Sequence, residues 1–196
     1  MKQPLRPGRA ALPLRHRAAI GLGANLGARE ASLRSALKQL NAQPGVVVER
    51  VSSFIETDAV GGPPGQPRYI NAAALLRTSL APAELLSLLQ TIEAGHGRTR
   101  SGARNEPRTL DLDLLFYDRR VIAEPGLEVP HPRLHERPFV LIPLAEIAPR
   151  IMHPVLGKTV RQLLAARAPT AGARPERRSC QTAYLRSAAR SAKKLG

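Results

Sequence analysis

The sequence predicts an α+β fold of the ferredoxin-like βαββαβ type, in which helices pack on a mostly antiparallel sheet. Segments with the period of a strand are interspersed with amphipathic helical segments, in the order strand-helix-strand, strand-helix-strand. At 196 residues the chain is long enough for one domain with a sizeable core. It contains no run of about 18 apolar residues, so we expect no transmembrane helix and no membrane partner.

The first strand-helix-strand unit covers residues 17–55. Residues 17–24 alternate, with Ala18, Ile20 and Leu22 on one face, and predict a strand. The β-branched run Val46–Ile55 predicts a second strand. Between them, apolar residues recur at i, i+3, i+4 and i+7 and predict a helix, namely at Leu33, Ala36, Leu37 and Leu40.

The second unit covers residues 69–115. A glycine- and proline-rich loop at 61–67 precedes it and cannot be helical. Residues 69–77 predict a strand, and the alternating segment 108–115 predicts the last strand of the sheet. The helix between them runs from Pro82 to Gly95 and has an apolar stripe of Leu85, Leu88, Leu89 and Ile92.

Smaller elements follow the second unit. Residues 121–122 and 127–129 predict short edge strands, and residues 130–138 predict a rigid, charged connection. The apolar segment 139–147 is expected to become helical at Pro143 and to end before Pro149. Thr159 to Ala166 predicts a last short helix.

The net charge of +15 is concentrated at the ends of the chain. Residues 1–17 carry five basic side chains and no acid, and residues 161–196 carry nine basic side chains against one glutamate. We therefore divide the chain into a basic, disordered extension (1–16), a single domain (17–167) and a basic, disordered tail (168–196). Nucleic acid is expected to bind only adventitiously, through these ends.

Cys180 is the single cysteine of the sequence. It cannot form an internal disulfide, which fits a reducing, cytoplasmic setting. We expect the protein to act there as a monomer.

Two acidic residues share one face of the last predicted strand. The period of two turns Leu110, Leu112 and Leu114 toward a core. Asp111 and Asp113 then lie together on the opposite side. Carboxylates held so close repel each other unless a cation or a shared proton lies between them, and the expected cation is Mg²⁺. The alternative is a half-buried strand with a solvated acidic face.

Basic residues flank this acidic pair in the sequence. Carboxylates for a metal and arginines for phosphate oxygens together predict a site for a nucleoside triphosphate. No residues suggest a Ser-His-Asp or Cys-His nucleophile, and no spacing suggests zinc. The flanking residues are Arg98, Arg100, Arg104 and Arg108 upstream, and His131, Arg133 and Arg137 downstream.

The glycine-rich segment Gly21–Gly27 leaves three interpretations open. It resembles the start of a dinucleotide-binding unit, but Leu26 stands where the third glycine or alanine of that fingerprint belongs. The glycines can instead form only a tight turn. Alternatively, the turn allows Asn25 to approach a ligand.

Five sequence blocks together resemble the 6-hydroxymethyl-7,8-dihydropterin pyrophosphokinase family of folate synthesis. The resemblance runs from about residue 17 to residue 167, which makes this the catalytic domain. The Arg-Thr-Leu-Asp-Leu-Asp block is the most specific of the five. The blocks are Gly23–Gly27, Ser52–Phe54, Tyr69–Ala73, Pro107–Asp113, and Val129–Arg133 with Arg137 and Phe139.

The resemblance implies transfer of pyrophosphate from ATP to the hydroxymethyl group of the pterin, with release of AMP. It places Asp111 and Asp113 on two Mg²⁺ ions and gives catalytic roles to Arg98 and Arg108. ATP is expected to contact Gln90, Glu93, Arg98, Arg100, Arg108, Leu114, His131 and Arg137. The pterin is expected to contact Gly23, Asn25, Thr57, Asp58, Val60, Tyr69, Asn71 and Phe139, with Tyr69 and Phe139 on its two faces.

The chain departs from the family pattern at three places. Asn105 stands where some members carry an aromatic residue, Ala24 replaces a common serine, and one extra residue lies between Phe54 and Asn71. Two rival functions follow from other features: a nucleic-acid-binding module that uses the basic ends, and a dinucleotide-dependent enzyme.

Overall fold

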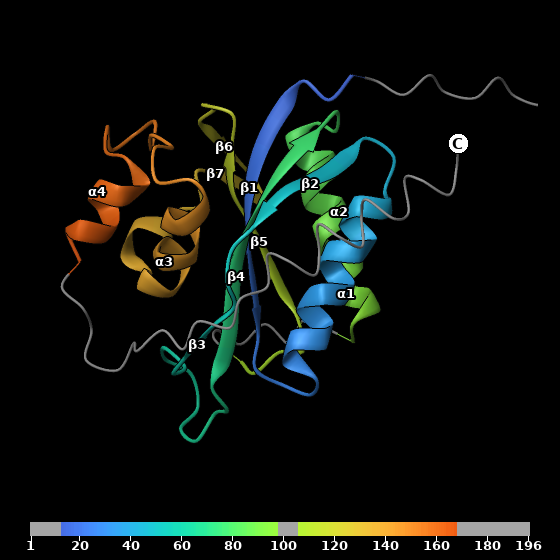
Figure 1. The fold of residues 1–196 in the computed structure, drawn as a ribbon, viewed down its shortest axis with the longest axis vertical. Coiled ribbons are helices and arrows are strands. Elements are labelled where there is room, and N and C mark those ends of the chain that lie inside the picture. Colours follow the sequence, from blue (N-terminus) through green and yellow to red (C-terminus); the bar gives the residue numbers. More distant parts are fainter. Residues whose placement is uncertain (1–12, 98–105, 168–196) are drawn as a thin grey trace, which may run out of the picture.

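The computed structural model describes residues 13–97 and 106–167 (Figure 1). Within this part of the chain, one sheet of five strands has the order β2-β4-β1-β5, with β3 also paired to β4. Each pairing in it is antiparallel. The strands are β1 (His16–Ala24), β2 (Val46–Val51), β3 (Ile55–Thr57), β4 (Tyr69–Thr78) and β5 (Asp111–Tyr117).

This topology confirms the ferredoxin-like prediction and excludes the dinucleotide-binding alternative. In a dinucleotide-binding unit the two parallel strands on either side of the helix pair directly with each other. Here β1 is antiparallel to both of its neighbours, β4 and β5, and β2 lies on the far side of β4.

The edge strand predicted for residues 46–55 is broken into two pieces. The register with β4 shifts between Val48 and Arg50, and β3 starts again at Ile55. Between the pieces, Ser52 is fully buried and bonds to both backbone groups of Ala73, at 2.9 Å each. The Ser52 hydroxyl therefore replaces one backbone hydrogen bond between the edge strand and β4, at the point where the edge strand bends.

Two helices cover one face of the sheet, on the right in Figure 1. They are α1 (Arg29–Ala42) and α2 (Pro82–Gly95). The buried residues of α1 are the predicted Leu33, Ala36, Leu37 and Leu40, and Leu85, Leu89 and Ile92 of α2 join the same core.

The other face of the sheet is also covered, by α3 (Pro138–Ile147) and α4 (Val160–Ala165) (Figure 1). Helix α3 begins at Pro138, so the prediction of a start at Pro143 is wrong. Pro138 occupies the first turn, where a missing N–H costs nothing. Pro143 lies inside the helix and is buried, and its neighbours Leu141 and Leu144 pack in a second apolar core, which favours the helix over the break that a proline tends to cause.

The two short strands predicted near residues 121–129 are present, but they pair with each other and not with the main sheet, and the last short helix is present as well. Strands β6 (Ile122–Glu124) and β7 (Leu127–Val129) form a separate hairpin, and a 3₁₀ turn covers Leu134–Glu136. Thr159 caps α4, because its hydroxyl accepts from the backbone N–H of Gln162. None of the helices in the described part of the chain is long and apolar enough to span a membrane.

Candidate active site

The candidate site lies on the middle of the sheet, where part of β1 carries no side chains on one face. Gly21 and Gly23 lie on the same face of β1, two residues apart, and carry no side chains to fill the space above it. In the register with β5, Gly21 faces Asp113 and Gly23 faces Asp111. On the other side, Gly23 faces Asn71 of β4. Gly21 and Gly23 therefore form a flat surface between the two carboxylates and the Asn71 amide, which we call the glycine floor.

The orientation predicted for the acidic pair is confirmed. Leu110, Leu112 and Leu114 are buried in the core shared with α1 and α2. Asp111 and Asp113 point to the other face of the sheet and line a pocket there. The carboxylates are partly exposed, at 21% for Asp111 and 34% for Asp113, so a ligand can reach both.

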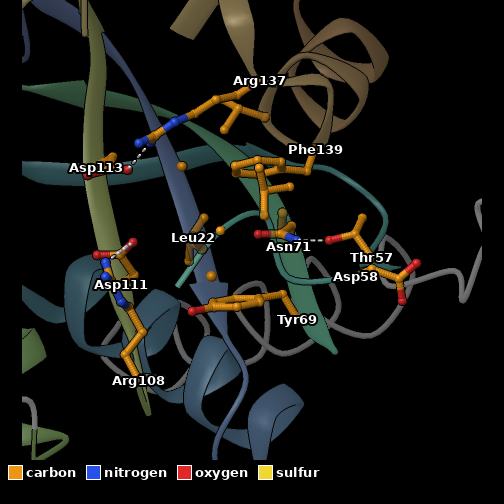
Figure 2. Close-up of a pocket in the computed structure, with 16 residues that line it drawn as sticks. Leu22, Thr57, Asp58, Tyr69, Asn71, Arg108, Asp111, Asp113, Arg137 and Phe139 are labelled. Atoms are coloured by element: carbon orange, nitrogen blue, oxygen red, sulfur yellow. Dashed lines mark hydrogen bonds and ion pairs between the residues drawn. The ribbon is translucent and has the colours of Figure 1, made fainter. Parts of the chain in front are cut away.

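An arginine pairs with each of these aspartates (Figure 2). Arg108 Nη1 donates to Asp111 Oδ2 at 2.8 Å, and Arg137 Nη1 lies 3.5 Å from Asp113 Oδ2. Burial opposes the charge of Arg108, but its acidic neighbours outweigh burial and raise its pKa above the ordinary value. The Arg108 guanidinium therefore stays charged next to Asp111.

His131 lies beside the same acidic pair. Its Nε2 is 3.9 Å from Asp113 Oδ2, and its Nδ1 accepts a hydrogen bond from the backbone N–H of Arg133. Burial, together with the positive charge of Arg137, lowers the pKa of His131 from 6.5 to about 4. The imidazole is therefore neutral at physiological pH, with Nε2 carrying the hydrogen as a donor.

Two aromatic rings enclose the other half of the pocket. Figure 2 shows the ring of Phe139 above and the ring of Tyr69 below, with Asn71 between them in this view. Tyr69 is held by its hydroxyl, which donates to the carbonyl of Glu106 at 3.3 Å. The pocket has an empty volume of about 690 Å³, part of it open to solvent. Aromatic faces of this kind are surfaces on which a flat ring system stacks.

The amide of Asn71 is held in a fixed orientation. Its Nδ2 donates to Thr57 Oγ1 at 2.8 Å, and both residues are buried. A Cβ atom on Gly23 would lie only 3.2 Å from Asn71 Oδ1. The amide oxygen therefore lies over the glycine floor and can accept from a ligand N–H.

The loop between β3 and β4 forms one wall of the pocket. Asp58, Val60 and Gly61 line it together with Thr57. The structure thus brings together most of the residues that the sequence assigned to the pterin: Gly23, Thr57, Asp58, Val60, Tyr69, Asn71 and Phe139.

Five of the predicted binding residues in the described part of the chain are not in the pocket lining. One of them, His131, lies next to it, 3.9 Å from Asp113 Oδ2. Gln90 is exposed on α2, whereas Glu93 of the same helix is buried and accepts the backbone N–H of Leu112 at 2.7 Å. Leu114 is buried in the core beneath the sheet. Asn25 is buried behind the floor, where its Oδ1 accepts the backbone N–H of Arg108 at 2.7 Å.

Other predictions fall outside the described residues. Arg98, Arg100, Arg104 and Asn105 belong to the segment 98–105, and the two basic ends, 1–12 and 168–196, are likewise not described.

Five lining residues were not predicted from the sequence. Gly21 and Leu22 precede Gly23 on β1, Ala72 follows Asn71 on β4, Gly61 lies in the loop and Val140 follows Phe139. Gly21 could have been found, because a Gly-x-Gly of period two next to an Asp-x-Asp of the same period predicts an uncovered strip between two strands.

The donor set suits a hard cation that arrives with a phosphate. Among residues 13–97 and 106–167, no group of three or more His, Cys, Asp or Glu side chains is gathered as a metal cage. Mg²⁺, however, is usually held by one or two carboxylates plus substrate phosphates and water. Asp111 and Asp113, both facing an open pocket, fit that pattern.

Comparison with known proteins agrees with this geometry. The family model of 7,8-dihydro-6-hydroxymethylpterin-pyrophosphokinase (HPPK) matches residues 19–149. The 2-amino-4-hydroxy-6-hydroxymethyldihydropteridine pyrophosphokinase of Synechocystis is 48% identical over 149 residues, which is 76% of this chain and 75% of that protein. The Bacillus subtilis protein of the same name is 49% identical over 132 residues, covering 67% of this chain and 78% of its own length.

A solved structure shares the fold. The Plasmodium falciparum HPPK-DHPS wild type with pterin and p-hydroxybenzoate matches 76% of this chain and 42% of its own, with a TM-score of 0.61 and 15% identity. The glycine floor, the acidic pair and the aromatic rings all lie within the 131-residue span that the family model matches. The chain therefore belongs to the 7,8-dihydro-6-hydroxymethylpterin-pyrophosphokinase family.

Proposed function

We propose that this chain transfers the terminal pyrophosphate of ATP to the hydroxymethyl group of 6-hydroxymethyl-7,8-dihydropterin and releases AMP. The observation that carries the proposal is one pocket with two halves. One half has two facing aromatic rings, and the other has two aspartates, each paired with an arginine. Membership of the family supports the same activity.

The aromatic half binds the pterin. Tyr69 and Phe139 stack on its two faces, and the Asn71 amide oxygen accepts from an N–H on its edge. This edge-on hydrogen bond fixes the rotation of the pterin in its plane. The hydroxymethyl group can then point across the glycine floor toward Asp111 and Asp113.

The charged half binds the polyphosphate. When bound, Mg²⁺ ions neutralise the phosphate oxygens and polarise the β-phosphorus, and we propose two ions held by Asp111 and Asp113. Arg108 and Arg137 then turn from the carboxylates to phosphate oxygens, for which their forked donors are suited. His131 is neutral, and its Nε2–H donates to a phosphate oxygen.

The reaction is a direct displacement at phosphorus. The hydroxymethyl oxygen attacks the β-phosphorus, the bond from that phosphorus to the oxygen bridging to the α-phosphate breaks, and AMP leaves with that oxygen. The hydroxyl proton passes to solvent. Such a step needs in-line positioning and charge neutralisation more than a covalent intermediate, and the pocket residues supply both.

Three further assignments belong to the proposal. Arg98 and Arg100 are assigned to ATP on the resemblance alone. The protein is proposed to act as a monomer. A cytoplasmic location is supported by ATP as co-substrate and by the single Cys180.

Product analysis of the wild-type protein tests the proposal. ATP and the pterin alcohol are incubated with and without Mg²⁺, and phosphorus NMR identifies the products. We expect AMP and a pterin pyrophosphate in equal amounts, only when both substrates and Mg²⁺ are present. Formation of ADP and a pterin monophosphate, or of AMP without the pterin, would refute pyrophosphate transfer to this acceptor.

A further inference from the structure

We infer that Gln66 is a positioning residue that couples the phosphate half of the pocket to the loop over the pterin. The inference rests on the proposed function. Gln66 does not line the pocket and was not singled out by the sequence. Its side chain is the middle link in a chain of hydrogen bonds that joins Arg108 to Gly61.

The chain starts at the backbone of Arg108. Asn25 Oδ1 accepts from Arg108 N at 2.7 Å, and Asn25 N donates to Arg108 O at 3.0 Å. Asn25 is only 2% exposed, so these bonds are shielded from water and hold the two backbones as a unit. Any displacement of Arg108 therefore moves Asn25.

The second link leaves Asn25 for the loop. Asn25 Nδ2 donates to Gln66 Oε1 and to the carbonyl of Pro67, both at 3.3 Å. Gln66 Nε2 in turn donates to the carbonyl of Gly61 at 3.0 Å. The orientation of the Gln66 amide is determined, because a flipped amide would set two N–H groups together at Asn25 and two oxygens together at Gly61.

The loop depends on this link for its position. Gly61, Gly62 and Gly65 have φ values of 75°, 81° and 75°, which is the left-handed region that glycine occupies freely. Val60, next to the bonded carbonyl, is 64% exposed and has no core contact to hold it. The hydrogen bond from Gln66 therefore determines how closely Val60 and Gly61 approach the pterin.

A second anchor of the loop is weaker. Arg68 Nε lies 3.0 Å from Asp58 Oδ1, and this pair joins the two ends of the loop. The Asp58 carboxylate is 68% exposed, so water and salt screen the pair. Gln66 is half-buried, its bond from Asn25 is partly buried and its bond to Gly61 is exposed. Neither partner is charged, so its contribution is less sensitive to salt.

Gln66→Met and Gln66→Glu test the inference. Methionine keeps the shape and loses both hydrogen bonds, whereas glutamate keeps the acceptor toward Asn25 and sets a carboxylate oxygen against the Gly61 carbonyl. The matched control is Gln39→Met, an exposed glutamine on α1 whose Nε2 donates to Ser35 Oγ. Calorimetry measures the dissociation constant of the pterin alcohol with and without α,β-methylene ATP and Mg²⁺.

The wild-type protein should bind the pterin more tightly when the ATP analogue is present. We expect both Gln66 variants to weaken pterin binding by about 5- to 30-fold, with Glu the weaker binder. They should also reduce the effect of the ATP analogue on that binding, while the affinity for the analogue alone changes by less than about twofold. Gln39→Met should match the wild type.

Two results separate this inference from the proposed function. If the wild type binds pterin and both Gln66 variants bind it equally well and with the same response to the ATP analogue, the inference is wrong and the proposed function stands. If the wild type binds no pterin, the proposed function fails and the inference fails with it. Loss of pterin affinity in the variants, with thermal unfolding unchanged, supports the positioning role.

Discussion

Arg108 and Asp111 form a hydrogen-bonded ion pair across one turn of the chain, with Nη1 2.8 Å from Oδ2. Both side chains are about four-fifths buried, at 21% exposure each, and both face the pocket. The carboxylate of Asp111 is suited to bind a cation, and the guanidinium of Arg108 is suited to bind a phosphate. The arrangement keeps both charges compensated until a metal-bound triphosphate replaces the pair.

Arg108→Gln should slow the reaction about 10²- to 10³-fold, because a donor directed at the developing phosphate charge is lost. Arg108→Lys should fall between, since it keeps the charge without the fork. The measurement is the rate of AMP formation at saturating substrates. Arg77→Gln is the control, because Arg77 pairs with Glu49 at the other end of β4. A rate for Arg108→Gln within about threefold of the control would contradict the assignment.

Phe139→Ala should weaken pterin binding about 5- to 150-fold, which corresponds to the loss of one stacked face. Tyr69→Ala should have a comparable effect, while Tyr69→Phe keeps the ring and loses the bond to the Glu106 carbonyl. Fluorescence titration with the pterin alcohol measures the dissociation constants. Equal affinities of the alanine variants and the wild type would exclude a stacked pterin.

Gly23→Ala should raise the KM for the pterin at least about tenfold. The added Cβ would lie 3.2 Å from Asn71 Oδ1 and would cover the floor next to Asp111. Gly95→Ala is the matched control, because nothing lies within 4 Å of its Cβ position. Steady-state kinetics with both substrates decides the matter: an unchanged pterin KM in Gly23→Ala would mean that the ligand does not approach this strip.

The lowered pKa of His131 predicts how the free energy of unfolding depends on pH. Its pKa in the folded protein is about 4, below the 6.5 of an exposed imidazole. Between these values the unfolded chain binds more protons, so this contribution to stability is present above about pH 6.5 and is lost as the pH falls toward 4. His131→Asn keeps an acceptor for the Arg133 N–H and removes the titration.

Urea unfolding from about pH 7 to about pH 5 measures the effect. The free energy of unfolding of the wild type should fall more steeply with decreasing pH than that of His131→Asn. Parallel curves for the two proteins would show that the imidazole titrates normally.

The sequence predicts those features that depend on local periodicity. Alternation along β5 places Leu112 and Asp113 on opposite faces, and the structure confirms it. The apolar stripe on α1 follows from the same kind of short-range rule.

What the sequence could not predict depends on contacts between distant segments. Glu93 is a charged residue on a helix, yet it is buried because it accepts the backbone N–H of Leu112, 19 residues away. Helix α3 starts at Pro138 because its apolar residues meet a second core, for which the prolines gave no indication. The role of Gln66 arises from contacts with Asn25 and Gly61 that only the folded loop creates.

The most direct test of the account is the rate of pterin-dependent AMP formation by Asp111→Asn and Asp113→Asn across a range of Mg²⁺ concentrations. Asp118→Asn is the control, because Asp118 directly follows β5 but pairs with His16, away from the pocket. We expect both pocket variants to lose at least about 10²-fold in rate while remaining folded, and Asp118→Asn to retain the wild-type rate and Mg²⁺ dependence. Wild-type rates in Asp111→Asn and Asp113→Asn, with an unchanged requirement for Mg²⁺, would contradict the claim that these carboxylates hold the metal.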